Sequence, residues 1–241
     1  MKKDHVFIGY IVHQKRLSGW LSLVFFFACF SVSYTKADAP EIQTLLKASV
    51  YEKVLKDRDT IAYASLDPVR GPTGLLGYKK YSFYAAMLVH SNLAVTRQIL
   101  TNYKLYAEMI PYIDKARYSE STRILEIEGG IWNFKLISEV TFTEVSDRWI
   151  QFEITKGHFL GLKGNLYFDN LGEKGTIVYL EGNILGKKWP PAFIVERGAE
   201  IVFRFTGSKM RSYIESKKYE TIVKGDNTHG EPKVPQPKRR F

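Results

Sequence analysis

The feature that most constrains the fold is a run of short strand-like segments followed by one long amphipathic segment. The strand-like segments alternate apolar with polar residues, or carry β-branched and aromatic ones, and cover residues 112–119, 122–128, 131–146, 148–156, 163–169 and 175–183. Between them lie short linkers with Gly, Asn and Asp, which are typical of hairpin turns. A linker of hairpin length joins only antiparallel neighbours, so these segments predict an antiparallel meander.

The long segment begins after Pro190-Pro191 and is predicted to be a helix from Ala192 to about Ser216. Its apolar residues recur at near-helical intervals and are Phe193, Ile194, Ala199, Ile201, Val202, Phe205, Tyr213 and Ile214. Gly207 and the serine after it predict a bend midway along this helix. A sheet must cover its apolar face, and this helix is long enough to do so. Together these segments predict an α+β, helix-grip fold, in which a curved antiparallel sheet wraps around the C-terminal helix.

The residues before the meander predict a few further elements. These are a helix over 40–56, a short strand over 59–66, a Gly- and Pro-rich loop after it, and a strong strand over 78–90. Asn92 is the predicted N-cap of the next helix, and a second short helix is expected to end at Ile110-Pro111.

The first 37 residues have the pattern of a secretory signal peptide. A basic stretch ending in Lys15-Arg16 precedes an apolar segment at 17–32 and a small-residue site that favours cleavage after Ala37. We therefore expect export, with a periplasmic location. A retained membrane anchor at 17–32 is the first alternative, although its helix would reach only about 24 Å across a hydrocarbon core of about 30 Å. Lipidation at Cys29 is the second.

Charge and cysteine content exclude several function classes. The formal net charge of +10 is concentrated in the first 37 residues and in the C-terminal tail, so the remainder is only mildly basic and no nucleic-acid partner is predicted. Cys29 is the single cysteine, and it lies within the predicted signal, which leaves no disulfide or cysteine nucleophile after cleavage.

Four parts of the chain are expected. They are a signal peptide or anchor at 1–37, an N-terminal extension at 38–77, a ligand-binding domain at 78–218 and a disordered basic tail at 219–241. Nothing in the sequence predicts an oligomeric state.

Catalytic and metal-binding patterns are scarce. Outside the two termini the histidines are His90 and His158, and no H-x-H, H-E-x-x-H or G-x-S-x-G pattern occurs. Arg197 and Arg204 could polarise a carbonyl from the last helix, but charges on the solvated face of an amphipathic helix explain them better. We predict no catalytic residue, no metal and no cofactor.

Three segments resemble the START-like (SRPBCC) superfamily, specifically its polyketide cyclase/dehydrase and coenzyme Q-binding branch. Residues 99–111, ILTNYKLYAEMIP, are similar to its aliphatic, Tyr, aromatic and aliphatic-Pro pattern. Residues 157–168, GHFLGLKGNLYF, are similar to its glycine-aromatic turn, and residues 175–179 fit the next strand. The resemblance covers about 78–216. It departs where the family's usual tryptophan in the strand at 164–168 is Leu166 or Tyr167.

The resemblance implies a cavity between the sheet and the last helix that binds a lipid, a quinone or a polyketide-like molecule. The predicted ligand-binding residues are Trp132, Phe134, Phe142, Trp149, Phe152, Phe168, Tyr179, Phe193, Ile201 and Phe205. The alternative for each of them is plain core packing, which is the more common role of aromatic side chains at strand and helix spacing. The predicted function is non-catalytic binding or transport of an apolar ligand in the cell envelope. The alternatives are a cyclase- or aromatase-type enzyme, and a module that contacts a membrane surface or another protein.

Overall fold

A computed structural model describes residues 38–57, 59–71, 74, 76–131 and 134–226, with side chains omitted at Ile131, Phe134 and 218–226. These residues belong to one compact unit that begins at Ala37. The predicted signal peptide with Cys29, the side chain of Trp132 and the tail from residue 227 onward lie outside the described residues.

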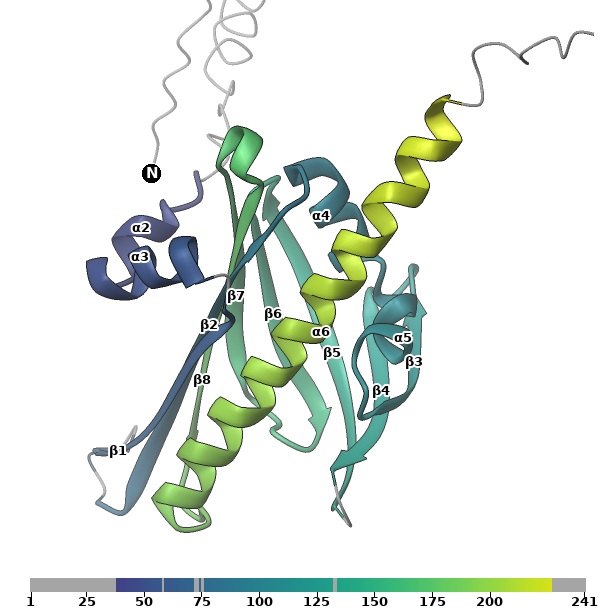
Figure 1. The fold of residues 1–241 in the computed structure, drawn as a ribbon. Coiled ribbons are helices and arrows are strands. Elements are labelled where there is room, and N and C mark those ends of the chain that lie inside the picture. The colour runs from purple at the N-terminus through teal and green to yellow at the C-terminus, as the bar shows by residue number, and fades with distance from the viewer. Residues whose placement is uncertain (1–37, 58, 72–73, 75, 132–133, 227–241) are drawn as a thin grey trace, which may run out of the picture. The chain divides into compact units, whose positions relative to one another are not determined.

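Eight antiparallel strands form one sheet in the order β1-β2-β8-β7-β6-β5-β4-β3 (Figure 1). The strands are β1 (Ile61–Val69), β2 (Tyr78–Val89), β3 (Ile113–Ser119), β4 (Ile124–Ile131), β5 (Phe134–Ser146), β6 (Trp149–Gly157), β7 (Lys163–Asn170) and β8 (Thr176–Gly186). From β3 to β8 each strand pairs with the next one in sequence, which confirms the predicted meander.

The remaining two strands join the sheet beside the last strand of the meander. β1 and β2 form a hairpin, and β2 pairs with β8 along its length, with Ala86 opposite Tyr179. β1 is an edge strand, so residues 61–69 of the predicted extension belong to the same sheet as the rest. It runs through Pro68, which the sequence placed in a loop; an edge strand tolerates a proline because one side of its backbone has no partner strand.

Short helices connect and cover the strands. They are α2 (Ile42–Leu45), α3 (Ala48–Asp57), α4 (Leu93–Thr101), η1 (Tyr103–Leu105), α5 (Tyr106–Met109) and η2 (Gly172–Lys174). The single helix predicted over 40–56 is thus two helices. The Asn92 side chain accepts a hydrogen bond from the Val95 N–H at 2.8 Å, which confirms the predicted N-cap.

The last helix, α6 (Ala192–Asp226), packs against one face of the sheet, here called the inner face (Figure 1). Its main contacts with the sheet are to β1 and β2. The curved antiparallel sheet and this long C-terminal helix confirm the predicted α+β, helix-grip architecture. The helix continues past its predicted end at Ser216.

Helix α6 is continuous through Gly207, so the predicted bend is wrong. A methyl group at this position would come within 2.5 Å of Thr60 Cγ2. The glycine therefore allows α6 to approach the residues before β1 closely, and it does not bend the helix. No helix among the described residues is long and apolar enough to cross a membrane.

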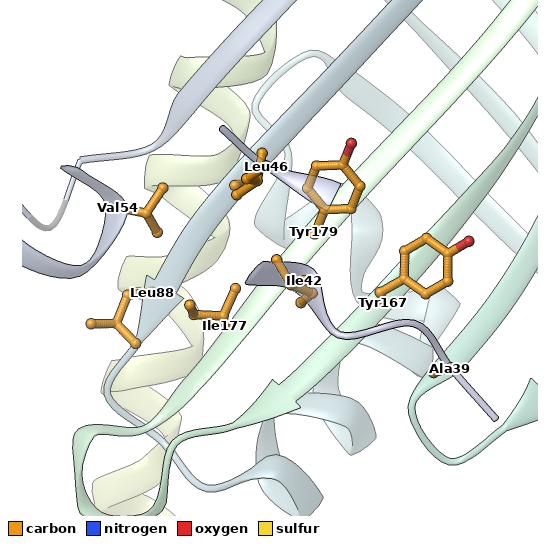
Figure 2. Close-up of a cluster of buried hydrophobic side chains, with 9 residues drawn as sticks. Ala39, Ile42, Leu46, Val54, Leu88, Tyr167, Ile177 and Tyr179 are labelled. Atoms are coloured by element: carbon orange, nitrogen blue, oxygen red, sulfur yellow. The ribbon is translucent and has the colours of Figure 1, made fainter. Parts of the chain in front are cut away.

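The opposite face, here called the outer face, is partly covered by α2 and α3. Their buried side chains meet the outward-pointing residues of β2, β7 and β8 in one cluster (Figure 2). This cluster consists of Ala39, Ile42, Leu46, Val54, Ala86, Leu88, Tyr167, Ile177 and Tyr179. Where α2 and α3 cover β2, β7 and β8, both faces of the sheet carry apolar side chains, because each face is covered by helices.

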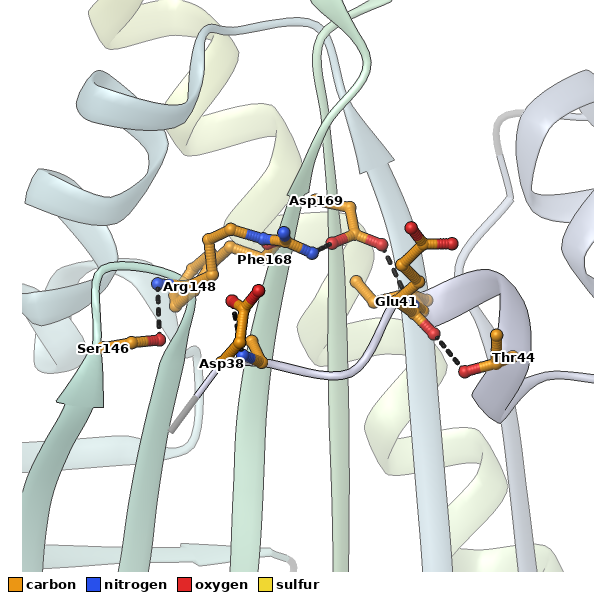
Figure 3. Close-up of polar contacts among 9 residues, drawn as sticks. Asp38, Glu41, Thr44, Ser146, Arg148, Phe168 and Asp169 are labelled. Carbon is orange, nitrogen blue, oxygen red and sulfur yellow. Dashed lines mark hydrogen bonds and ion pairs between the residues drawn. The ribbon is translucent and has the colours of Figure 1, made fainter. Parts of the chain in front are cut away.

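An ion pair holds the start of the described chain on the outer face. Asp169 of β7 accepts a hydrogen bond from the Ile42 N–H at 2.7 Å and pairs with the Arg148 guanidinium (Figure 3). Arg148 also donates through Nε to the Phe168 carbonyl at 3.2 Å. The carboxylate thus joins the first turn of α2 to the β5–β6 turn and β7.

Candidate ligand-binding site

The inner face beside α6 is the region that the sequence analysis singled out. The ring of Phe83 on β2 stacks on Phe203 of α6, with ring centroids 4.5 Å apart. The Phe83 ring also occupies the space that a side chain at Gly182 would need. Trp189, Ala192, Val195 and Ala199 add apolar contacts around this stack. Here the sheet and helix pack directly against each other.

Further along the inner face, strands β4, β5 and β6 present an apolar surface that is only partly covered. Phe142, Phe152 and Ile154 are half-buried and pack against the buried Leu125 and Val140. The Phe152 ring lies over Gly164 of β7. Because α6 makes its main sheet contacts with β1 and β2, these side chains are left partly accessible.

Helices η1 and α5 border this surface. Tyr103 of η1 stacks on Phe142 with ring centroids 4.0 Å apart, and Tyr106 donates a hydrogen bond to the Leu100 carbonyl at 2.9 Å. Tyr112 donates to the Val202 carbonyl of α6 at 3.3 Å. Burial raises the pKa of Tyr81, Tyr103 and Tyr112, so these hydroxyls stay protonated at neutral pH. Tyrosine hydroxyls therefore stand among the apolar side chains of this face and its borders.

The predicted ligand-binding residues do not lie on one surface. Phe142, Phe152 and Phe168 are on the inner face, where Phe168 is fully buried. Trp149 and Tyr179 are on the outer face, in or against the cluster under α2. The sequence pattern does not separate Trp149 and Tyr179 from the inner residues, because both faces of β6, β7 and β8 carry aromatic side chains. The structure thus separates Trp149 and Tyr179 from the space beside α6.

The three predicted residues of α6 point away from the sheet. Phe193, Ile201 and Phe205 are 68%, 67% and 48% exposed. The contacts of α6 with the core instead come from the half-buried Ala199, Phe203 and Met210 and the buried Ile214, which recur at four- and seven-residue spacing. Phe134 is the first residue of β5, and its side chain is not described.

Sequence reasoning missed Ile154 and Phe83 as members of the inner face. A usable signal was present, since Ile150, Phe152 and Ile154 alternate on one strand and therefore share a face. Whether any of these residues contacts a ligand stays a prediction.

Neither histidine of the folded part forms part of a metal site. The His158 ring is hydrogen-bonded through Nδ1 to the backbone of Ile137 at 3.1 Å, and its carbonyl accepts from Ser138 Oγ at 2.7 Å. Its role is to fix the β6–β7 turn. Across the described ranges, no group of three or more His, Cys, Asp or Glu side chains could hold a metal ion.

A surface hollow with a volume of about 580 Å³ lies mainly on the outer face, and Phe83 and Phe152 of the inner face are also among the residues that line it. Its polar groups bind one another: Glu181 accepts from Asn165 at 3.0 Å and from the Tyr179 hydroxyl at 3.2 Å. Asn165 in turn accepts from the Trp149 indole N–H at 2.9 Å. An apolar ligand would have to cover these groups, so the hollow does not suit one.

The second hollow, with a volume of about 360 Å³, lies beside α6 near the start of β1. It is bordered by Asp59 and Thr60 on one side and by Arg204, Arg211 and their neighbours on the other. On the sequence alone, Arg204 is a group that could polarise a carbonyl, and a charge on the solvated face of the helix is the favoured interpretation.

Comparison with known proteins gives matches among solved structures alone. No protein-family model and no curated protein sequence matches this chain. A START superfamily protein from Mycobacterium smegmatis matches with a TM-score of 0.46 and 12% identity, over 58% of this chain and 98% of its own. The Zhui aromatase/cyclase from Streptomyces sp. R1128 matches with a TM-score of 0.47 and 10% identity, over 59% and 96%. A STAR-related lipid transfer protein fragment from Xanthomonas axonopodis matches with a TM-score of 0.44 and 11% identity, over 62% and 98%.

At these identities the likeness concerns the fold and not the ligand. The chain itself has the curved antiparallel sheet and long C-terminal helix of the expected helix-grip fold, together with an outer cover formed by α2 and α3.

Proposed function

We propose that this protein binds an apolar molecule, without catalysing a reaction on it, on the inner face of strands β4 to β6 beside α6. The observation that carries the proposal is the partly covered apolar surface of Phe142, Phe152 and Ile154. Half-buried side chains of this size gain free energy when a ligand removes them from water, by about 25 cal/mol per Å² of apolar area. A lipid or a quinone has the required apolar area.

The tyrosine hydroxyls at the borders of this surface suit a ligand with a polar end. The Tyr103 hydroxyl, whose pKa is raised by burial, can donate to a carbonyl or ester oxygen, whereas Tyr112 already donates its proton to the Val202 carbonyl and can only accept from a ligand. The alternative function, a cyclase or aromatase, would use the same hydroxyls to polarise a carbonyl. A binder would release the bound molecule unchanged, whereas an enzyme would release a different compound.

We further propose that loading takes place at a membrane of the cell envelope. Exposed apolar residues gather at the end of the sheet where the β1–β2, β4–β5 and β6–β7 turns and the start of α6 meet. These residues are Leu76, Ile137, Phe159, Leu160, Leu185, Phe193 and Ile194. Lys187 and Lys188 lie in the link between β8 and α6 at the same end. Apolar side chains flanked by lysines favour contact with an anionic bilayer.

The β6–β7 turn is fixed in a form that exposes its apolar residues. Phe159 has a φ of 61°, a backbone conformation that residues other than glycine rarely adopt. The turn is nevertheless tied to β6 by hydrogen bonds from Ile154 N–H to the Leu162 carbonyl and from Gly161 N–H to the Ile154 carbonyl, both 2.9 Å. A held conformation that keeps Phe159 in solvent is consistent with a contact function.

The ligand proposal is tested by filling the inner face. Delipidated protein would be titrated with a fluorescent methyl ester of a polyene fatty acid, comparing the wild type with Ile154→Trp and Gln151→Trp. Gln151 is exposed on the opposite face of the same strand and lines the outer hollow. We expect Ile154→Trp to lose binding by about tenfold or more, and Gln151→Trp to bind as the wild type does.

Three results would contradict the proposal. Wild-type protein that takes up no ester and carries no apolar molecule when purified from its own envelope lacks the function. Loss of binding in Gln151→Trp alone would move the site to the outer face. Conversion of the bound molecule to a new compound, seen by mass spectrometry, would favour the enzyme.

The membrane proposal has a separate test. Co-sedimentation with vesicles of phosphatidylcholine, with and without phosphatidylglycerol, would compare the double variant Phe159→Ser and Leu160→Ser with Tyr63→Ser, an exposed aromatic on the outer face of β1. We expect the double variant to weaken binding to anionic vesicles several-fold and Tyr63→Ser to leave it unchanged. Equal binding by both variants would remove this end of the sheet as the contact surface.

A further inference from the structure

The hollow between α6 and the residues before β1 is lined both by apolar side chains and by arginines that form no ion pair with a carboxylate of the described residues. It has a volume of about 360 Å³, and Arg204 and Arg211 line it together with Ile201 and Phe205. Arg204 and Phe205 come three and four residues after Ile201, and Arg211 comes seven residues after Arg204, so the four residues lie along one flank of α6. This flank is distinct from the inner face, because the hollow opens at the β1 edge of the sheet.

Within the part of the chain that the structure describes, two polar atoms of residues at this hollow are buried without a hydrogen-bond partner. They are Oγ1 of Thr60, a residue that is only 5% exposed, and Nη1 of Arg211. A buried donor left unsatisfied costs about 1–3 kcal/mol, so native proteins rarely retain one without a reason. Both atoms belong to residues that line the hollow, and each carries a proton that it could donate to an anion.

The close crossing at Gly207 holds this pair of residues in place. Thr60 lies directly against Gly207, so the hydroxyl is fixed next to the turn of α6 that carries Arg204 and Arg211. Ser208 adds a further hydroxyl to the lining of the hollow. The donors are thus arranged before any ligand binds.

The charges around the hollow favour an anion. Asp59 is its one lining carboxylate, against the two guanidinium groups. Within the described residues, neither Arg204 nor Arg211 lies within 4.0 Å of a carboxylate, whereas Arg197 on the same helix is paired with Glu200 at 3.1 Å. The two arginines of the hollow therefore keep a net positive charge available for a ligand.

We propose that this hollow binds an anionic amphiphile: a carboxylate or phosphate head between Arg204, Arg211 and Thr60, with its alkyl chain along Ile201 and Phe205. The arginines supply charge-assisted hydrogen bonds to the head. Ile201 and Phe205, both exposed, supply the apolar surface for the chain, which explains why large apolar residues stand among cations on the outside of α6. The amphiphile can be a free acid or a lipid of a bilayer.

The test is calorimetric titration of the full chain with dodecyl phosphate, inorganic phosphate and dodecanol. We expect dodecyl phosphate to bind at least about tenfold more tightly than either of the other two, because only it satisfies both halves of the hollow. Arg204→Gln should weaken it about tenfold, and Thr60→Val several-fold. Arg197→Gln is the matched control, and it should bind as the wild type does.

Arg211 is partly buried, so Arg211→Gln would be interpreted only if its thermal unfolding matches that of the wild type. Arg204 is exposed, and its variant keeps the test decisive in either case. Equal affinity of wild type and Arg204→Gln for dodecyl phosphate would overturn the proposal, as would equally tight binding of dodecanol or of inorganic phosphate.

Vesicles distinguish the two sources of the amphiphile. If phosphatidic acid vesicles retain wild type but not Arg204→Gln, the source is a bilayer lipid. If dodecyl phosphate binds and the vesicles retain neither protein, the source is a free amphiphile. The variants of the membrane-facing end, Phe159→Ser and Leu160→Ser, leave this hollow intact, and Ile154→Trp does not touch it. Failure of this site is therefore separable from failure of the proposed function.

Discussion

The ring of Phe83 on β2 and the ring of Phe203 on α6 stack with their centroids 4.5 Å apart and their planes inclined by 17°. The contact joins the middle of strand β2, next to the β1 edge of the sheet, to the helix that covers it. It also rests on Gly182, because any side chain there would meet the Phe83 ring.

Truncating this contact should loosen α6. We expect Phe203→Ala to lower the free energy of unfolding by about 2–3 kcal/mol, since it removes both the stacking and the apolar burial. Phe193→Ala, at an exposed position of the same helix, should change it by less than about 0.5 kcal/mol. Urea unfolding followed by far-ultraviolet circular dichroism measures both. Equal effects of the two substitutions would show that the stack does not hold the helix.

Two glycines of α6 should respond to alanine in opposite directions. Gly207→Ala places a methyl group against Thr60 and should lower the free energy of unfolding by about 1–3 kcal/mol. Gly198→Ala meets no atom within 4 Å, and should raise it by up to about 1 kcal/mol through helix propensity. Thermal unfolding of the two variants checks the sign. A stabilised Gly207→Ala variant would mean that α6 does not cross Thr60 closely.

Removing the Asp169 carboxylate should release α2 from the outer face. Asp169→Ala leaves the Ile42 N–H and the Arg148 guanidinium without their acceptor, and should lower the free energy of unfolding by about 1–3 kcal/mol. Hydrogen exchange should accelerate at Ile42 and Leu46 before it does in β7. Glu173→Ala, at an exposed position in η2, is the control and should change neither quantity.

Stability should fall steeply in alkali. Burial raises the folded-state pKa of several tyrosines, most strongly those of Tyr81, Tyr103, Tyr106, Tyr112 and Tyr179. In the unfolded chain these groups ionise near pH ~10, so above this pH the unfolded state binds fewer protons than the folded one and the free energy of unfolding decreases. Below it the tyrosines contribute no pH dependence.

The measurement is tyrosinate absorbance recorded beside circular dichroism as the pH is raised. The buried tyrosines should ionise in one cooperative step together with the loss of structure, and Tyr81→Phe should reduce the slope of stability against pH. If all tyrosines ionise while the dichroism stays native, their burial in the fold is wrong.

The sequence was sufficient to predict the meander and the closing helix, and the physical reasons are local. Hairpin-length linkers leave antiparallel pairing as the solution, and Asn92 marks a helix start by its side-chain chemistry. Helix α6 showed its period clearly enough to be recognised. Both kinds of signal depend on residues close together in the chain.

The faces of the elements could not be assigned in the same way. Trp149 and Ile150 lie on opposite faces of β6, yet both are large and apolar, because α2 covers the outer face at that end. On α6, the exposed Ile201 and Phe205 are as large and apolar as Phe203, which packs against the sheet. Which apolar residue is buried depends on what packs against it, and that is decided by contacts between distant segments.

The pairing of β2 with β8 has a consequence for how the chain folds. Met87 and Val178 are register partners, although the whole meander lies between them in sequence. Closing so long a loop delays the contact, and proteins dominated by such contacts fold in about milliseconds to seconds rather than microseconds. Until β8 has been synthesised, the β1–β2 hairpin has no neighbour within the sheet. The eight-stranded sheet can therefore be completed only when nearly the whole chain from β1 to Gly186 is available.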